Sequence, residues 1–259
     1  MCNPILNTKR GMTVSMKLKE NILGVDVTAL PIESLLNDIE QRIVSKEKGR
    51  IVAINPEKIM MAQKDKNLAN LLNESTYQIP DGVGVSIASK LLKGSIRWRI
   101  TGVGMMDRLL QKANENKYKV FFYGAKEETV VKAISEISKK YPDIIVAGYV
   151  NGYEKNQEHI VDQINLANPD IVFVALGSPR QEIFIDTHMN ELSATIFQGV
   201  GGSFDVFSGQ VKRAPAFFRK FGLEWLYRLV SQPSRFKRQL ALPLFLLMVI
   251  KQKTAKGNG

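Results

Sequence analysis

One carboxylate stands at a position where a sheet could use it for chemistry. Asp81 lies in the segment IPDGVGV, directly after a predicted strand and before a predicted helix. Ligands bind at the carboxyl ends of parallel strands, and a carboxylate there could accept the proton of an attacking hydroxyl group. Asp81 could instead cap the helix, or Gly82 and Gly84 could form a phosphate-binding turn. This segment alone leaves all three interpretations open.

Two other predicted strand ends carry polar side chains. In AINPEK, Asn55 precedes Pro56, a typical helix start, so capping and hydrogen bonding to a sugar hydroxyl are equally good interpretations. In ALGSPRQEIF, Ser178 and Gln181 have the spacing of a capping box. A helix N-terminus also attracts anions, so Gly177, Arg180 and Gln181 are candidate contacts to a phosphorylated ligand.

Glycine-rich segments follow two more predicted strands. QGVGGSFD could bring backbone N–H groups against a nucleotide, or it could simply close the edge of the sheet. FYGAK is a shorter candidate of the same kind, through Gly124 and Ala125. We favour nucleotide contact for both. The candidates from the longer segment are Gly199, Gly201, Gly202, Ser203 and Asp205.

Several well-known site patterns do not occur in the sequence. There is no G-x-x-x-x-G-K-[ST] phosphate loop, no G-x-S-x-G elbow, and no D-x-D triplet to hold a metal on a nucleotide diphosphate. The only histidines, His159 and His188, stand apart, and Cys2 is the only cysteine. We therefore expect no metal and no cofactor. Arginines would have to neutralise a diphosphate, although each alone could equally be a solvated or lipid-facing charge: Arg97, Arg99, Arg228, Arg235 and Arg238.

Strand and helix patterns alternate along the chain, which predicts an α/β fold with a mainly parallel, Rossmann-like sheet and helices on both faces. The predicted strands are 22–27, 51–54, 76–79, 119–123, 144–147, 171–176 and 195–199. The predicted helices are 31–45, 56–72, 83–92, 104–116, 127–140, 156–167 and 179–192.

Charge divides the 259-residue chain unevenly. Residues 212–259 hold eleven Lys or Arg and one acid, whereas the rest is almost neutral. We expect a disordered extension at 1–20, an α/β catalytic domain at 21–211, and a basic amphipathic appendage at 212–259, divided near Pro233 into two helices. We expect this appendage to lie on an anionic membrane, and favour this over the alternative that its last helix packs on the core. Charge confined to one end disfavours nucleic acid, and exposed apolar surface could drive homo-oligomer formation.

Six motifs resemble, in the same order, those of the WecG/TagA/CpsF glycosyltransferases: NPEK, IPDGVGV, RITGVGMMDRLL, FFYGAK, NPDIVFVALGSPRQEIFI and GVGGSFDVFSGQVKRAP. The resemblance covers about residues 22–251. It implies an inverting, metal-independent transfer of N-acetylmannosamine from a UDP-sugar donor, UDP-N-acetylmannosamine. The acceptor would be the lipid-linked GlcNAc of undecaprenyl diphosphate, and its 4-hydroxyl would receive the sugar, as in wall teichoic acid synthesis. Alternatives are UDP-N-acetylmannosaminuronate or UDP-glucose as donor, or a non-catalytic membrane-binding protein.

The resemblance also suggests roles for individual residues. It implies that Asp81 is the general base, that Asn55 shares its pocket, and that Gln181 lies near the sugar or acceptor. Ala53 stands where the family often has threonine, so this chain lacks a hydroxyl group at that position. The appendage would close over the site and bring arginines to the diphosphate, with the enzyme cytoplasmic and peripheral on the inner face of the cell membrane.

Overall fold

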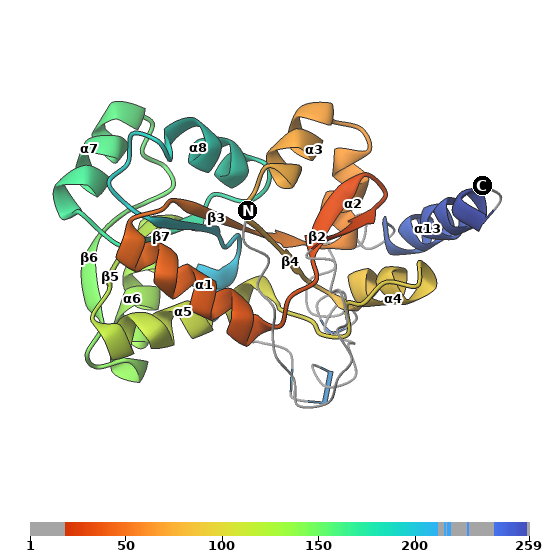
Figure 1. Ribbon diagram of the computed structural model, residues 1–259. Helices are drawn as coiled ribbons and strands as arrows, with labels where there is room; N and C mark the ends of the chain where they lie inside the picture. Colours follow the sequence, from red (N-terminus) through yellow and green to blue (C-terminus); the bar gives the residue numbers. More distant parts are fainter. Residues whose placement is uncertain (1–18, 212–214, 216, 219–226, 228–240, 258–259) are drawn as a thin grey trace.

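A six-stranded parallel sheet forms the centre of the computed structural model, which describes residues 19–211, 215, 217–218, 227 and 241–257 (Figure 1). All five neighbouring pairs are parallel, as predicted from the alternation of elements. In spatial order the strands are β4 (Tyr77–Pro80), β3 (Gly49–Ile54), β8 (Ile196–Gly199), β7 (Ile171–Ala175), β5 (Lys119–Gly124) and β6 (Ile145–Val150).

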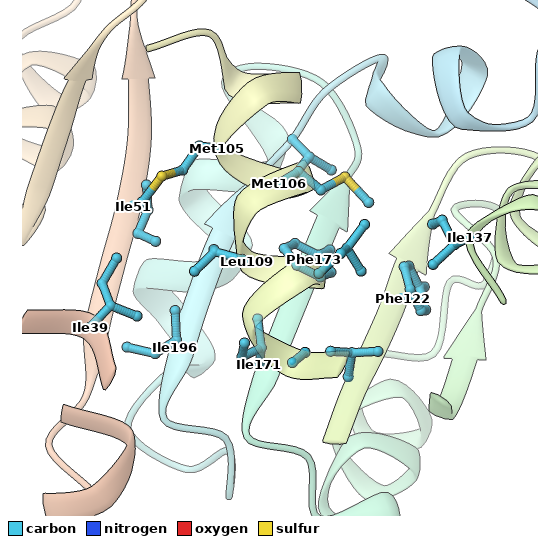
Figure 2. Packing of buried hydrophobic residues seen from close by; sticks show 14 of the residues in the cluster. Ile39, Ile51, Met105, Met106, Leu109, Phe122, Ile137, Ile171, Phe173 and Ile196 are labelled. Carbon is cyan, nitrogen blue, oxygen red and sulfur yellow. The ribbon is translucent and has the colours of Figure 1, made fainter. Parts of the chain in front are cut away.

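Helices cover both faces of this sheet because its central strands are apolar on both sides. On one face lie α1 (Ile32–Ser45), α5 (Gly102–Asn116), α6 (Glu127–Lys140) and α9 (Ser203–Phe207); on the other lie α7 (Gln157–Ala167) and α8 (Arg180–His188). Figure 2 shows α5 packing Met105, Met106 and Leu109 over the strands. Successive residues of β7 point to opposite faces of the sheet. Phe173 packs on the face covered by α5, whereas Val172 and Val174 pack under α7 and α8.

A third apolar cluster lies beside the β3–β4 end of the sheet. It joins α2 (Pro56–Ala62), α3 (Lys66–Asn73), α4 (Val83–Leu91) and an antiparallel pair, β1 (Lys19–Ile22) and β2 (Val25–Thr28). The prediction of one strand over 22–27 is wrong, because Leu23 and Gly24 form a turn with positive φ. Residues 19 and 20, expected within the N-terminal extension, already belong to β1.

The single helix predicted over 56–72 is two helices. The Asp65 side chain accepts hydrogen bonds from the backbone N–H groups of Asn67 and Leu68 and so starts α3. The predicted helix over 179–192 is also shorter than expected, since α8 ends at His188.

The last described helix, α13 (Ala241–Gly257), packs against α2 and α4 (Figure 1). Phe245 and Val249 are fully buried one turn apart, so the alternative of a helix packed on the core is confirmed for this face. The opposite face leaves Leu244, Leu247 and Ile250 about half exposed. None of the described helices is both long and apolar enough to span a bilayer. The predicted division at Pro233 lies outside the described residues.

Candidate active site

A pocket of about 300 Å³, here called the Asp81 pocket, opens where β3, β4 and β8 end. Asn55 follows β3 and Asp81 follows β4, and both line this pocket. The structure thus brings together two polar side chains that the sequence had placed at separate strand ends. The other predicted site residues that line it are Ala53, Gly177, Gln181, Gly199, Gly201, Gly202, Ser203 and Asp205.

A second hollow of about 580 Å³, the Arg180 pocket, lies beyond the ends of β5 and β7. Ala125 and Arg180 were predicted and do line it. The two pockets share four lining residues: Gly177, Gly201, Gly202 and Asp205. A single elongated ligand lying across these shared residues could therefore occupy both pockets.

Asp81 does not occupy the N-cap position of a helix. The N-cap of α4 is Gly82, one residue later. The backbone N–H of Asp81 donates to the carbonyl of Ile54 at 2.8 Å, which prolongs the β3–β4 ladder by one bond. Gly84 makes room for protein rather than ligand, because a Cβ there would lie 2.5 Å from Pro56 and 2.9 Å from Leu242.

Asn55 does cap a helix. Its Oδ1 accepts from the N–H of Lys58 at 2.8 Å, which satisfies one of the free donors at the start of α2. The amide is only partly buried and still lines the Asp81 pocket, so its NH₂ group faces a site where a ligand oxygen could accept from it. Capping and ligand contact are thus compatible at this residue.

The predicted capping box at Ser178 is wrong. The N-cap of α8 is Pro179, and the side chain of Gln181 turns inward instead. Its Nε2 donates to Glu182 Oε1 at 2.9 Å, and its Oε1 accepts from the N–H of Gly201 at 2.9 Å. Gln181 is 3% exposed and spans from α8 to the glycine-rich segment.

Glu182 also pairs with a lysine. Lys58 Nζ donates to Glu182 Oε1 at 2.8 Å, and the two side chains are 8% and 5% exposed. Burial by itself raises the pKa of Glu182, but the charge of Lys58 and the hydrogen bonds from Lys58, Gln181 and Ser178 outweigh it and hold that pKa below its usual value. The carboxylate is therefore ionised at neutral pH.

The glycine-rich segment uses part of its hydrogen-bonding capacity internally. Gly201 N–H is held by Gln181, Ser203 N–H donates to the Val200 carbonyl at 3.2 Å, and the Ser203 hydroxyl donates to the same carbonyl at 2.6 Å. Among the described residues, Gly202 N–H has no such bond, and Gly202 is exposed at the boundary of both pockets.

Three predicted contacts lie apart from both pockets. Gly124 permits a close approach of backbone, since a Cβ there would lie 2.5 Å from the carbonyl oxygen of Ala175. Arg97 is exposed, and Arg99 is half-buried in the segment that follows α4, where Ile100 N–H donates to the Pro80 carbonyl at 2.9 Å. Arg228, Arg235 and Arg238 lie outside the described residues.

The described charges around the Asp81 pocket are mainly acidic. Glu57, Asp81 and Asp205 line it, and its lysine, Lys58, is paired with Glu182. The Arg180 pocket is mixed, with basic Lys126, Lys155 and Arg180 against acidic Glu128, Glu154 and Asp205. In the part of the chain that the structure describes, no three His, Cys, Asp or Glu residues gather as a metal site.

Sequence reasoning missed the role of Lys58, the fourth residue of NPEK. A cation in the first turn of a helix is electrostatically unfavourable, and that conflict was the available signal. It also missed Thr101, which lines the Asp81 pocket. The Thr101 hydroxyl caps α5 by accepting a hydrogen bond from Gly104 N–H at 3.0 Å.

The buried pair predicts a pH dependence of stability. Because the folded pKa of Glu182 is lowered, its contribution is complete above the unfolded value near 4.5 and disappears as pH falls through the lower folded value. Glu182→Gln should lower the free energy of unfolding by about 3 kcal/mol at neutral pH. Urea titrations should show this difference shrinking below about pH 4.5, and a difference constant with pH would contradict the assignment.

The family model described as "Glycosyl transferase WecG/TagA/CpsF family" matches residues 20–259. Two similar proteins carry the name N-acetylglucosaminyldiphosphoundecaprenol N-acetyl-beta-D-mannosaminyltransferase. The one from Bacillus subtilis (strain 168) is 39% identical to this chain, over 92% of this chain and 93% of its own length. The one from Staphylococcus aureus (strain MW2) is 36% identical, over 91% of this chain and 93% of its own length. The enzyme of that name from Bacillus spizizenii is 39% identical over 90% of this chain and 91% of its own. The chain is a glycosyltransferase and belongs to the WecG/TagA/CpsF family.

Proposed function

We propose that this enzyme transfers N-acetylmannosamine from UDP-N-acetylmannosamine to the 4-hydroxyl of GlcNAc on undecaprenyl diphosphate. The names of its relatives support this acceptor and sugar. The observation that carries the proposal is the pair of adjacent pockets at the strand ends, which share four lining residues; one is lined by Asp81 and the other by both basic and acidic side chains. A nucleotide sugar and an acceptor hydroxyl need such an arrangement.

The nucleotide would lie in the Arg180 pocket. Its lining is mixed, so Lys126, Lys155 and Arg180 could meet anionic groups of the nucleotide while the acidic side chains could accept hydrogen bonds from its base or ribose. The diphosphate would then reach the residues that both pockets share, among them the exposed Gly202. This arrangement leaves the sugar in the Asp81 pocket, with the acceptor approaching Asp81.

The proposed reaction is a single displacement. Asp81 takes the proton of the acceptor 4-hydroxyl as that oxygen forms its bond to the anomeric carbon, and the bond from this carbon to the diphosphate oxygen breaks. UDP leaves with the electron pair, and the configuration at the anomeric carbon inverts. Asn55, next to Asp81 at the strand ends, would orient a sugar hydroxyl through its NH₂ group.

The leaving diphosphate needs positive charge that the described pocket residues do not provide in excess. Lys58, the lysine that lines the Asp81 pocket, is already paired with Glu182. We therefore assign its neutralisation to arginines brought from other segments, with Arg97, Arg99, Arg228, Arg235 and Arg238 as candidates, and propose that no metal takes part.

UDP release in the presence of a lipid-linked GlcNAc acceptor tests this reaction. We expect turnover with UDP-N-acetylmannosamine, and at least about tenfold less with UDP-N-acetylmannosaminuronate or UDP-glucose. Turnover should survive EDTA. Preference for another donor would revise the substrate, inhibition by EDTA would contradict the metal-free mechanism, and no release with any donor would indicate a binding protein.

Asp81→Asn tests the general base. The variant keeps the size of the side chain but cannot take a proton, so we expect kcat to fall by roughly 10²- to 10⁴-fold with the fold intact. Asp65→Asn is the matched control, because Asp65 is also an aspartate next to the start of a helix but lies outside both pockets. Equal activity of the two variants would exclude Asp81 as the base.

The exposed face of α13 suits a membrane surface, as an acceptor on a lipid carrier requires. Leu244, Leu247 and Ile250 are 51%, 59% and 47% exposed, with Lys251 and Lys253 following them. Apolar side chains beside basic ones are typical of helices that lie in the interface of an anionic bilayer. We propose that this face contacts the inner surface of the cell membrane.

Vesicle sedimentation tests this contact. Replacing Leu244, Leu247 and Ile250 by glutamine should weaken binding to phosphatidylglycerol vesicles roughly tenfold or more, because the apolar area that enters the interface is lost. Replacing Val44, Val131 and Leu166, which are exposed elsewhere, is the matched control and should have little effect. Equal loss in both variants would contradict a specific membrane face.

A further inference from the structure

We propose that Lys58, Glu182 and Gln181 form a positioning relay that fixes the backbone of Gly201, and with it the glycine segment shared by both pockets. Gln181, expected to contact sugar or acceptor, is on this view a positioning residue. The part that concerns nucleotide affinity rests on the proposed function. The part that concerns Gly201 does not.

The relay is a continuous chain of hydrogen bonds. Lys58 Nζ and Gln181 Nε2 both donate to Glu182 Oε1, at 2.8 and 2.9 Å, and Gln181 Oε1 accepts from Gly201 N–H at 2.9 Å. It links α2 through α8 to the segment after β8. Since Asn55 is the N-cap of α2, the helix that carries Lys58, one buried cation connects both sides of the Asp81 pocket.

Charge determines which way the Gln181 amide faces. An ionised carboxylate only accepts hydrogen bonds, so the NH₂ group of Gln181 must face Glu182 and its carbonyl oxygen must face Gly201. Without that carboxylate the amide could rotate and present its NH₂ group to the Gly201 N–H, placing two donors against each other. Lys58 keeps Glu182 ionised, because burial alone favours the neutral acid.

Stability alone does not account for this pair. A buried ion pair usually contributes little net stability over apolar packing, and the first turn of a helix is an unfavourable place for Lys58. Packing also confines Gln181, since a Cβ at Gly199 would lie 2.7 Å from Gln181 Nε2. The Gln181 amide is therefore held by the charge of Glu182 at its NH₂ group and by the close backbone of β8 at Gly199.

Hydrogen exchange at Gly201 tests the relay without any ligand. In protein labelled with ¹⁵N-glycine, we expect the Gly201 amide to exchange at least about tenfold faster in Glu182→Leu and in Gln181→Met. The double variant should be no faster than the faster single variant, because both substitutions break the same chain. Gly49, whose N–H donates to Thr195 at 2.9 Å, is an internal reference for general loosening.

Asp186→Leu is the matched control. Asp186 also lies on α8 and pairs with a buried cation, Arg50 on β3, at 2.5 Å, but neither residue lines either pocket. This variant should lose stability and leave the exchange of Gly201 relative to Gly49 unchanged. Unchanged Gly201 exchange in Glu182→Leu, or an equal effect of Asp186→Leu, would overturn the relay.

Calorimetric titration with UDP tests the consequence for binding. We expect the Kd for UDP to rise roughly tenfold in each single relay variant, with no further rise in the double variant. Additive losses would mean that the two residues act separately and would contradict the relay. If the wild-type protein binds no UDP, the proposed function fails, whereas Gly201 exchange still decides on the relay.

Discussion

The hydrogen bond from the Asp81 N–H to the carbonyl of Ile54 is the interaction on which the site depends. It continues the parallel pairing of β3 with β4, in which Ile54 lies opposite Pro80. Asn55 and Asp81 are the next residues on each strand, so the ladder itself sets them side by side. Parallel register then brings the end of β8 to the same edge, with the glycine segment.

The sequence allowed much of this arrangement to be predicted, because strand ends in a parallel sheet converge whatever the loops do. Asn55, Asp81 and the residues after Gly199 were identified in that way. The interactions between elements were not predictable. Gln181 has the spacing of a capping box, but its partner is Gly201, 20 residues away, and the partner of Lys58 is 124 residues away. The positions of Gly84 and Gly124 were predictable, but not that protein atoms occupy the space beside them.

Packing connects the C-terminal helix to the site. Leu242 in the first turn of α13 lies against Gly84, and Pro56 lies against the same residue from α2. The two helices that α13 covers are those that begin beside Asn55 and Asp81. The helix α13 would thus contact the membrane with its outer face, while its inner face supports the turns that carry Asn55 and Asp81.

We propose that one nucleotide sugar spans the two adjacent pockets, with its reacting end at Asp81. A crystal structure with bound UDP would show whether it does. We expect the uracil in the Arg180 pocket and the diphosphate at Gly177, Gly201 and Gly202, with the terminal phosphate directed toward Asp81. A uracil lying in the Asp81 pocket, or a UDP bound away from the shared glycines, would contradict it.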